Sequence, residues 1–301
     1  MDGILAVWKP EGWTSHDVVA KVRRILGMKR IGHAGTLDPM VTGVLPLCLG
    51  RATRVVEYIQ ERPKAYEAVL RLGIATDTED ISGTVLESQS VVNVTAAEVR
   101  AALERFTGRI DQVPPMYSAV KIDGKRLYEL AREGQTVERK ARQVTIHEIA
   151  LIDAQLDLDQ PQIKFSVLCS KGTYIRTLCV DIGKALGVPA TMASLTRTMS
   201  GGITQESCLT LEQIERLKQA GELERHLIAP DAAISHLERA EVPAASGKQA
   251  LLGQKIAIRH AALDNPEDGR LVRLYNEGQT FLGIFQIDSQ AAVLKPVKVF
   301  S

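Results

Sequence analysis

A single carboxylate, Asp38, has the surroundings in this chain that point most directly to chemistry. It lies in the segment 32–39, which reads GHAGTLDP in one-letter code. Glycines at 32 and 35 permit backbone conformations that are closed to other residues, and Pro39 favours an extended backbone at Asp38. We therefore expect this carboxylate to be presented in a loop rather than buried, where it can act as a nucleophile.

A run of cations precedes this loop. Residues 21–30, called the basic segment below, contain no acid and five cations: Lys21, Arg23, Arg24, Lys29 and Arg30. Such a run is the local footprint of phosphate contacts, although a run of charge is more often a solvated helix face. The formal net charge of the whole chain is only +1. Affinity for nucleic acid would therefore come from clustered cations.

The segment 169–178 (CSKGTYIRTL) predicts a strand that passes through a glycine turn into a helix, with Lys171, Tyr174 and Arg176 at the junction. Strand ends are common places for functional residues. Arg176 can pair with Asp38 and favour its charged form, while an ordinary structural ion pair is equally consistent with the spacing.

Two further features are typical of RNA contacts. Tyr66 follows Lys64 at the start of an expected strand and can stack on a base, although a tyrosine in a strand more often belongs to the core. Between residues 114 and 132, cations and tyrosines interleave as on an RNA-facing surface, while Pro114 and Pro115 are also typical of a plain loop.

Hydrophobic spacing predicts a helix over 15–26, with Ser15 as its N-cap and Gly27 as its stop, and this helix would deliver the basic segment to the Asp38 loop. Two capping boxes predict further helices: Thr95 with Glu98, closed by Gly108, and Thr210 with Gln213, closed by Gly221. Alternating polarity predicts strands at 66–72 and 163–169, and shorter ones at 271–275, 281–287 and 293–299.

Composition narrows the class of protein. With 301 residues and 45% hydrophobic content, the chain can bury a large core and is expected to hold one large domain and one smaller domain. Its N-terminal apolar run is too short for a signal peptide and no later run reaches membrane-spanning length, so we expect a cytoplasmic protein without a membrane partner. Its four cysteines, at 48, 169, 179 and 208, show neither metal-ligand spacing nor a disulfide framework and are expected to be buried reduced thiols.

Five segments, in order, resemble the successive motifs of the TruB family of tRNA pseudouridine synthases: 9–15 (KPEGWTS), 32–43, 64–66 (KAY), 114–121 and 170–178. The resemblance spans most of residues 1–230. The tail is similar to the PUA-type RNA-binding module that follows the catalytic domain in this family.

This resemblance implies isomerisation of uridine 55 in the T loop of tRNA to pseudouridine, without a metal or an organic cofactor. Asp38 matches the catalytic aspartate. Attack on ribose C1′ and attack on the uracil ring are both compatible with this role. Arg176 matches the arginine that pairs with this aspartate. Tyr66 matches the tyrosine that stacks on the flipped base and is implicated in removing the C5 proton. Because an unperturbed tyrosine has a pKa of about 10, a positioning or relay role remains an alternative.

The resemblance also implies a set of substrate contacts. His33 matches a histidine associated with opening the T loop, Tyr174 and Leu195 match positions that line the uracil pocket, and Lys121 matches a basic position near the substrate strand. Lys9, in the first motif, is expected to bind substrate. The implied partner is the T stem-loop of tRNA, and no obligate protein partner is implied.

Two other classes of function would share some of these features. A phosphate-binding-loop enzyme is disfavoured because no Gly-x-x-x-x-Gly-Lys-Ser/Thr pattern occurs and no paired acids follow for magnesium. A noncatalytic tRNA-binding or tRNA-folding protein would share the basic segment and the C-terminal module, but it would not need Asp38 and Arg176 together. That activity can also be a second role of the same chain.

The fold class expected is α+β. The resemblance implies a catalytic domain over residues 1–240, built on a mixed, largely antiparallel sheet flanked by helices. A small β-rich PUA-like domain follows over residues 241–301. A shift in composition between residues 230 and 243 is consistent with a boundary there.

Overall fold

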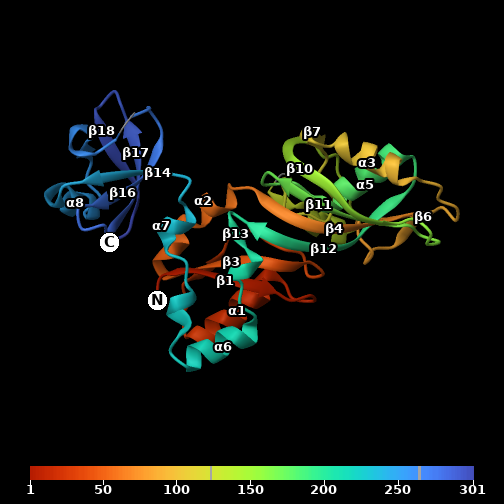
Figure 1. Ribbon diagram of the computed structural model, residues 1–301, viewed down its shortest axis with the longest axis horizontal. Coiled ribbons are helices and arrows are strands. Elements are labelled where there is room, and N and C mark those ends of the chain that lie inside the picture. The colour runs from red at the N-terminus through yellow and green to blue at the C-terminus, as the bar shows by residue number, and fades with distance from the viewer. Residues whose placement is uncertain (123, 264–265) are drawn as a thin grey trace.

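The computed structural model describes residues 1–122, 124–263 and 266–301, and within them the largest element is a nine-stranded sheet (Figure 1). Its strand order is β1-β3-β12-β4-β11-β10-β7, with β2 added beside β3 and β13 beside β12. The strands are β1 (Gly3–Lys9), β2 (Ile31–His33), β3 (Thr42–Leu49), β4 (Lys64–Leu72), β7 (Gly108–Gln112), β10 (Arg142–Gln155), β11 (Gln162–Cys169), β12 (Ala190–Ser200) and β13 (Ile203–Thr204).

Every pairing in this sheet is antiparallel except that of β12 with β3, as far as the described residues go. The parallel pairing is short and joins Thr196 to Thr42 and Arg197 to Gly43. It links a half-sheet of β1, β2 and β3 to a larger half-sheet that begins with β12. The expected mixed, largely antiparallel sheet is confirmed.

The alternation predicted for the two central strands is confirmed in β4 and β11. On β4 the even-numbered side chains from Lys64 to Leu72 are buried, and the odd-numbered ones are partly exposed. Because successive side chains of a strand point to opposite faces, Tyr66 lies on the buried face with Ala68 and Leu70.

Helices cover the two half-sheets separately (Figure 1). The larger half is covered by α3 (Ala96–Glu104) and α5 (Ile175–Leu186), and the smaller half by α1 (Ser15–Leu26) and α6 (Leu211–Gln219). Apolar side chains of α1 such as Val18 and Val22 pack on Leu45 and Leu47 of β3. Each half-sheet therefore has its own hydrophobic core.

The ends of these helices differ in part from the sequence predictions. Both predicted capping boxes are confirmed, at Thr95 and at Thr210. Helix α1 is capped by Thr14 rather than Ser15, because Thr14 accepts the amide of Asp17 while the hydroxyl of Ser15 bonds the backbone of Leu37.

Glycine placed two helix stops correctly and one incorrectly. Gly27 ends α1 in the left-handed conformation, as predicted. Gly221, with a φ of +72°, directly follows the C-cap residue of α6 and is also left-handed. Helix α3 stops at Glu104, and its C-cap Arg105 keeps right-handed helical backbone angles, so Gly108 lies beyond the end of this helix.

Shorter elements connect the large ones. They are η1 (Gly50–Val55), α2 (Val56–Gln60), β5 (Ile74–Thr76), β6 (Val85–Ser88), β8 (Lys121–Ile122), β9 (Lys125–Arg126), α4 (Leu127–Arg132), η2 (Gln205–Ser207), η3 (Leu223–His226) and α7 (Pro230–Ala233). The pairs β5–β6 and β8–β9 form two small two-stranded sheets.

A separate five-stranded sheet forms the C-terminal domain, in the order β14-β16-β17-β18-β15. Its elements are β14 (Glu238–Val242), α8 (Ala244–Leu251), β15 (Ile256–Ala257), η4 (Ile258–His260), β16 (Leu271–Asn276), β17 (Phe281–Asp288) and β18 (Val293–Val299). The three strands predicted in the tail are confirmed.

The C-terminal domain packs against η1 and α2 of the large domain (Figure 1). Phe300 and Ile284 share one hydrophobic cluster with Val55 and Ile59. Polar contacts surround this cluster: Arg51 donates to the carbonyl of Phe300 at 3.3 Å, and Lys298 pairs with Glu57 at 2.9 Å. The two domains are therefore joined by a hydrophobic cluster that continues into β1 and β3 of the large domain.

All four cysteines are free thiols. Cys48, Cys169 and Cys179 are buried, while Cys208 is partly exposed. None of the helices in the described part of the chain has the length and apolar character needed to cross a membrane.

We predict that Phe300→Ala weakens the junction between the domains. Truncation of a buried phenylalanine removes its contacts and leaves a cavity, which costs about 3 kcal/mol or more of unfolding free energy. The matched control is Val297→Ala on β18, whose side chain is 40% exposed and whose truncation should cost about 0.5 kcal/mol or less. Urea denaturation of the two variants checks the difference, and equal midpoints would contradict the role given to Phe300.

Candidate active site

The loop between β2 and β3 presents Asp38, whose side chain is 49% exposed, as the sequence predicts. Its position is fixed from the neighbouring residue. The buried hydroxyl of Ser15 accepts the amide of Leu37 at 2.8 Å and donates to the carbonyl of Leu37 at 3.2 Å. The N-terminus of α1 therefore holds the loop one residue before the carboxylate.

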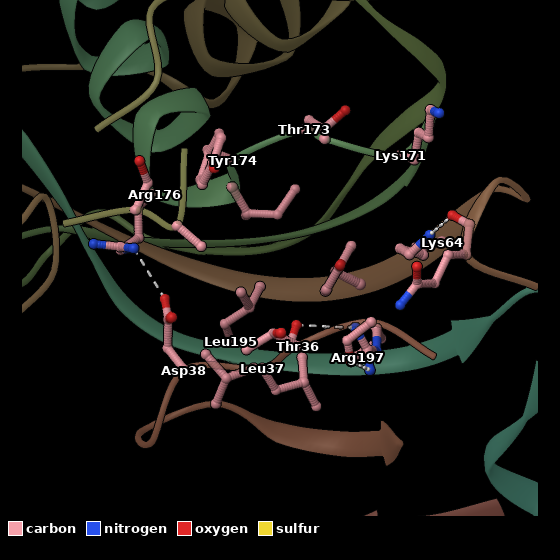
Figure 2. A pocket seen from close by; sticks show the side chains of 18 of the residues that line it. Thr36, Leu37, Asp38, Lys64, Lys171, Thr173, Tyr174, Arg176, Leu195 and Arg197 are labelled. Atoms are coloured by element: carbon pink, nitrogen blue, oxygen red, sulfur yellow. Dashed lines mark hydrogen bonds and ion pairs between the residues drawn. The ribbon is translucent and has the colours of Figure 1, made fainter. Parts of the chain in front are cut away.

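Arg197 of β12 holds the other side of the loop (Figure 2). This side chain is 1% exposed, and its guanidinium donates to three carbonyl oxygens of the loop and of the strand that follows it. The partners are Val44 at 2.8 Å, Gly35 at 3.0 Å and Thr36 at 3.4 Å. Arg197 is thus a positioning residue for the loop that carries Asp38.

Gly43 permits the close approach that this arrangement needs. Its φ is +115°, and a Cβ built there would lie 2.2 Å from the carbonyl oxygen of Arg197. A side chain at position 43 would push β12 away from β3. The glycine that follows the Asp38 loop is therefore required by the parallel pairing of Gly43 with Arg197.

Arg176, at the start of α5, forms an ion pair with Asp38, with 3.0 Å between Nη2 and Oδ2 (Figure 2). Only 7% of the Arg176 side chain is exposed. The guanidinium is oriented by the carbonyls of Thr78 at 2.9 Å and Tyr117 at 2.7 Å, and a second carboxylate, Asp80, lies 3.9 Å away. The guanidinium therefore has little freedom to leave Asp38.

Two buried polar groups fix the first turn of α5. The side-chain amide of Gln112 bonds both the carbonyl and the amide of Tyr174, at 3.0 and 2.8 Å. Thr177 donates to Glu79 at 2.6 Å. Burial raises the pKa of Glu79, and the Thr177 hydrogen bond and the charge of Arg176 oppose this shift.

The carboxylate opens into a cavity of about 380 Å³ between the two half-sheets. The structure brings together here five residues singled out in the sequence: Asp38, Tyr66, Tyr174, Arg176 and Leu195. These five residues contribute a carboxylate, a guanidinium, two aromatic rings and an aliphatic side chain to the lining. This combination can hold a flat, partly polar ring against a nucleophile.

Tyr66 is 8% exposed, and burial raises its pKa above the ordinary value of 10. The positive charge of Arg197 lowers this pKa but does not outweigh burial. The phenol is therefore protonated at neutral pH, which favours a relay or positioning role over direct action as a base.

A second, larger cavity of about 1030 Å³ shares Asp38 and Arg176 with the first. Its lining contains His33 and Lys121. Burial is the main cause of a lowered pKa for His33. The carboxylate thus lies where a narrow pocket meets a broad groove.

The interleaved segment 114–132 forms one wall of this larger cavity. Its Arg126 donates to the hydroxyl of Tyr128 at 2.9 Å, and the guanidinium of Arg132 lies 5.5 Å from the centre of the Tyr128 ring. Position 123 lies outside the described residues.

Lys9 does not occupy the position expected of a substrate contact. It is fully buried, and its ammonium donates to the carbonyls of Pro10, Trp13 and Pro39, with distances of 2.8, 2.5 and 3.0 Å. We therefore replace the expected substrate contact by a positioning role: Lys9 ties the start of α1 to the residue after Asp38.

The basic segment also lies elsewhere than expected. It is the N-terminus of α1 that meets the Asp38 loop. The five cations lie from the middle of the helix onward, and the first of them, Lys21, pairs with Glu215 of α6. Neither cavity described above is lined by any of the five. A cluster read along the chain carries no information about which end of its helix faces a site.

Sequence reasoning missed two buried cations in the narrow pocket, Arg197 and Lys64. Lys64 is 8% exposed and donates to the carbonyls of Gln60 at 2.8 Å and Arg62 at 3.0 Å. Burial is the main cause that lowers its pKa to about 8, and the charge of Arg197 adds to it. The alternation of 66–72, extended by two residues, would have placed Lys64 on the buried face.

No cluster of three or more metal-ligating side chains occurs among the residues that the structure describes.

Three family models together cover most of the chain. Residues 23–175 match the N-terminal domain of TruB family pseudouridylate synthase, residues 176–240 match the C-terminal domain of tRNA pseudouridylate synthase B, and residues 239–300 match the C-terminal region of pseudouridine synthase II TruB.

Relatives and solved structures agree with these models. The chain is 45% identical over 303 residues to tRNA pseudouridine synthase B of Geobacillus thermodenitrificans, covering 100% of each. It resembles a protein in the crystal structure of a Cbf5-Nop10-Gar1 complex, with a TM-score of 0.78 and 27% identity over 99% of this chain and 85% of that one. A structure of an H/ACA RNP bound to a substrate RNA containing 2′-deoxyuridine matches with a TM-score of 0.77 and 25% identity, over the same shares of both chains.

We predict that Lys9→Met changes stability in a pH-dependent way. Burial, as the largest cause, lowers the pKa of Lys9 from 10.5 to about 8 in the folded chain. Between these values the unfolded chain binds more protons, so the contribution of Lys9 to stability rises with pH and is least favourable below pH 8. Lys9→Met has no ammonium group at this position and lacks this rise in stability with pH.

The difference in unfolding free energy between wild type and Lys9→Met should therefore grow from pH 7 to pH 9.5, as measured by urea denaturation. Lys218→Met, on the exposed face of α6, is the control and should show no such trend. A difference for Lys9→Met that stays constant over this range would contradict the effect.

Proposed function

Since the chain belongs to the TruB family of pseudouridylate synthases, we propose that it isomerises uridine 55 in the T loop of tRNA to pseudouridine. The observation that carries this proposal is the half-exposed carboxylate of Asp38, paired with the buried Arg176 at the mouth of a pocket that Tyr66, Tyr174 and Leu195 also line. The resemblance of five segments of the sequence to the successive motifs of this family supports the same target.

The reaction must break the bond between N1 of uracil and C1′ of the ribose, turn the base and rejoin it to C1′ through C5. The site therefore needs a nucleophile and a pocket that retains the free base. We propose Asp38 as this nucleophile. Its carboxylate attacks either C1′ of the ribose or C6 of the uracil ring. In both cases Arg176 keeps the carboxylate oxygens oriented while the base turns.

Tyr66, Tyr174 and Leu195 are proposed to hold the base. Two aromatic side chains and a leucine offer apolar surface for a planar ring and few fixed polar partners, which suits a base that must rotate. The phenol of Tyr66, kept protonated by its raised pKa, is proposed to relay the C5 proton rather than to remove it as a phenolate.

The larger cavity is proposed to receive the T stem-loop. A base must leave its stack before the chemistry, at a cost of a few kcal/mol that stacking and backbone contacts can offset. His33 and Lys121, together with Arg126 and Tyr128, line this groove beside Asp38. They are proposed to contact the opened loop and its backbone.

The C-terminal residues 241–301 are proposed to act as a PUA-like RNA-binding domain beside a catalytic domain of residues 1–240. No residue of β14–β18 lines either of the two cavities at Asp38 in the described part of the chain. This supports a contact surface for RNA rather than a source of reacting groups. A role in tRNA folding would use the same surfaces without Asp38.

We expect Asp38→Asn to abolish conversion while RNA binding persists. The amide keeps the size of the side chain but is not an anionic nucleophile, and the loss of one negative charge beside the RNA leaves affinity unchanged or slightly higher. The measurement is pseudouridine formation on an unmodified tRNA transcript, with binding followed separately.

Asp38→Asn leaves the buried guanidinium of Arg176 without its nearest carboxylate, and an uncompensated buried charge can cost about 3 kcal/mol. Circular dichroism must therefore show that the variant is folded. Asp153→Asn, at an exposed position on β10, is the control. A folded Asp38→Asn variant with the parent rate would exclude Asp38 as the nucleophile.

Tyr66→Phe keeps the ring and removes only the hydroxyl. We expect the single-turnover rate to fall by about 100-fold or more, as for loss of a general acid–base group, with little change in the affinity for tRNA. Tyr58→Phe on α2, outside both cavities, should leave the rate unchanged. If Tyr66→Phe turns over at the wild-type rate, the hydroxyl has no part in the mechanism.

A further inference from the structure

Lys64 and Arg197 are two buried cations on the wall of one cavity whose hydrogen-bond partners are all carbonyl oxygens. Neither forms an ion pair in the described part of the chain, where the nearby acids Asp38 and Glu61 pair with Arg176 and Lys171 instead. The two charges are close enough that Arg197 lowers the pKa of Lys64.

This arrangement is costly for a purely structural purpose. A buried charge without a counter-ion loses its hydration, and a second like charge nearby adds repulsion. Carbonyl dipoles offset part of the cost. The positive potential that remains is directed into the cavity, where it stabilises any negative charge that forms there, because a low-dielectric site screens it weakly.

The Lys64 ammonium has a donor to spare. An ammonium carries three protons, and two of them are directed to the carbonyls of Gln60 and Arg62. No third acceptor is present within the residues that the structure describes. Figure 2 shows Lys64 and Lys171 on the side of the cavity away from Asp38. A base held between Asp38 and this wall would turn an edge toward Lys64.

Both routes of the proposed reaction place one negative charge on that base. In attack at C1′, a bond forms between a carboxylate oxygen of Asp38 and C1′, the C1′–N1 bond breaks, and its electron pair stays on N1 and is shared with O2 and O4. In the other route Asp38 adds to the uracil ring. A bond forms between a carboxylate oxygen and C6, and the π electrons of C5=C6 move to C5 and O4. The nucleophile loses its charge and the ring gains it in either case.

We propose that Lys64 donates a hydrogen bond to a carbonyl oxygen of the uracil ring and, together with Arg197, stabilises the negative charge on this ring. The ring carries that charge from the attack of Asp38, at C1′ or at C6, until it is reattached through C5. This inference rests on the proposed function. It assigns to the pocket an anion-stabilising wall opposite the nucleophile, the counterpart of an oxyanion hole.

The first test compares Lys64→Met, which removes the charge at similar length, with Lys64→Arg, which keeps it. Loss of one preorganised donor to a developing anion costs about 100-fold in rate. We expect this loss in the single-turnover rate of Lys64→Met at saturating tRNA transcript, with affinity within about threefold of wild type. Lys64→Arg should recover much of the rate.

The matched control is Lys164→Met on β11. Lys164 lies outside both cavities, its side chain is 43% exposed, and it pairs with Glu67, whose side chain is 41% exposed. Because exposed ion pairs contribute little, this variant should stay within about threefold of wild type. Equal losses for Lys64→Met and Lys164→Met would overturn the assignment to Lys64.

A second substrate separates charge stabilisation from a structural role. In RNA with 5-fluorouridine at the target position, the electron-withdrawing fluorine stabilises the ring anion. The loss of rate in Lys64→Met, measured as cleavage of the C1′–N1 bond or as formation of the adduct with Asp38, should therefore shrink by roughly tenfold. A defect of the same size on both substrates would mean that Lys64 acts only by supporting the fold, and the proposal would fail.

The pH profile of Lys64→Arg provides a test that does not depend on the folding of Lys64→Met. The charged or titratable groups facing Lys64 are Arg197, Cys169, Glu61 and Lys171. The wild-type rate should decline above pH about 8 as the ammonium loses its proton, whereas Lys64→Arg should keep its rate to higher pH. The same alkaline decline in both would contradict the proposal.

The outcomes also separate this inference from the function on which it rests. A wild-type chain that converts no uridine in the transcript would contradict the proposed function, and the inference with it. An active wild type with an equally active Lys64→Met variant would contradict the inference alone.

Discussion

The pairing of Arg197 with Gly43 is the contact on which the rest of the site depends. Through its backbone it joins two half-sheets that otherwise have separate cores. Through its side chain it holds the carbonyls of Gly35 and Thr36, three and two residues before the carboxylate. The Asp38 loop belongs to one half-sheet and Tyr66 to the other. Their relative position is therefore set where Gly43, having no side chain, lets the two strands come close.

Local features of the sequence predicted local features of the structure well. The alternation at 66–72 and 163–169 gave strands with the correct buried face, because burial on one side of a sheet imposes a period of two. The capping boxes at Thr95 and Thr210 were correct because they depend on contacts within one turn. At α1 a tertiary contact decided between two adjacent hydroxyls, since the hydroxyl of Ser15 is used by the Asp38 loop.

The features that sequence reasoning missed are cations whose partners are backbone carbonyls. Both members of an ion pair can be recognised in the sequence by their residue types, as with Asp38 and Arg176. A backbone carbonyl can belong to any residue, so its residue type gives no such signal. Arg197 bonds Val44, which lies 153 residues away, and no pattern in the chain records that contact. Lys9 and Lys64 went unrecognised as buried residues for the same reason. The family motifs identified the position of Lys9 but not its use.

The place of β12 in the sheet has a consequence for how the protein is made. This strand pairs with β3 on one side and β4 on the other, yet it is the last long strand of the large domain to leave the ribosome. Until residues 190–200 are available, the two half-sheets have no common strand and the Asp38 loop lacks Arg197. Because chains are synthesised at about 5 to 20 residues per second, a nascent chain spends seconds with all its earlier motifs complete and no assembled pocket. The pocket is thus completed only when this late strand joins the two half-sheets, and not when the segment that carries Asp38 is made.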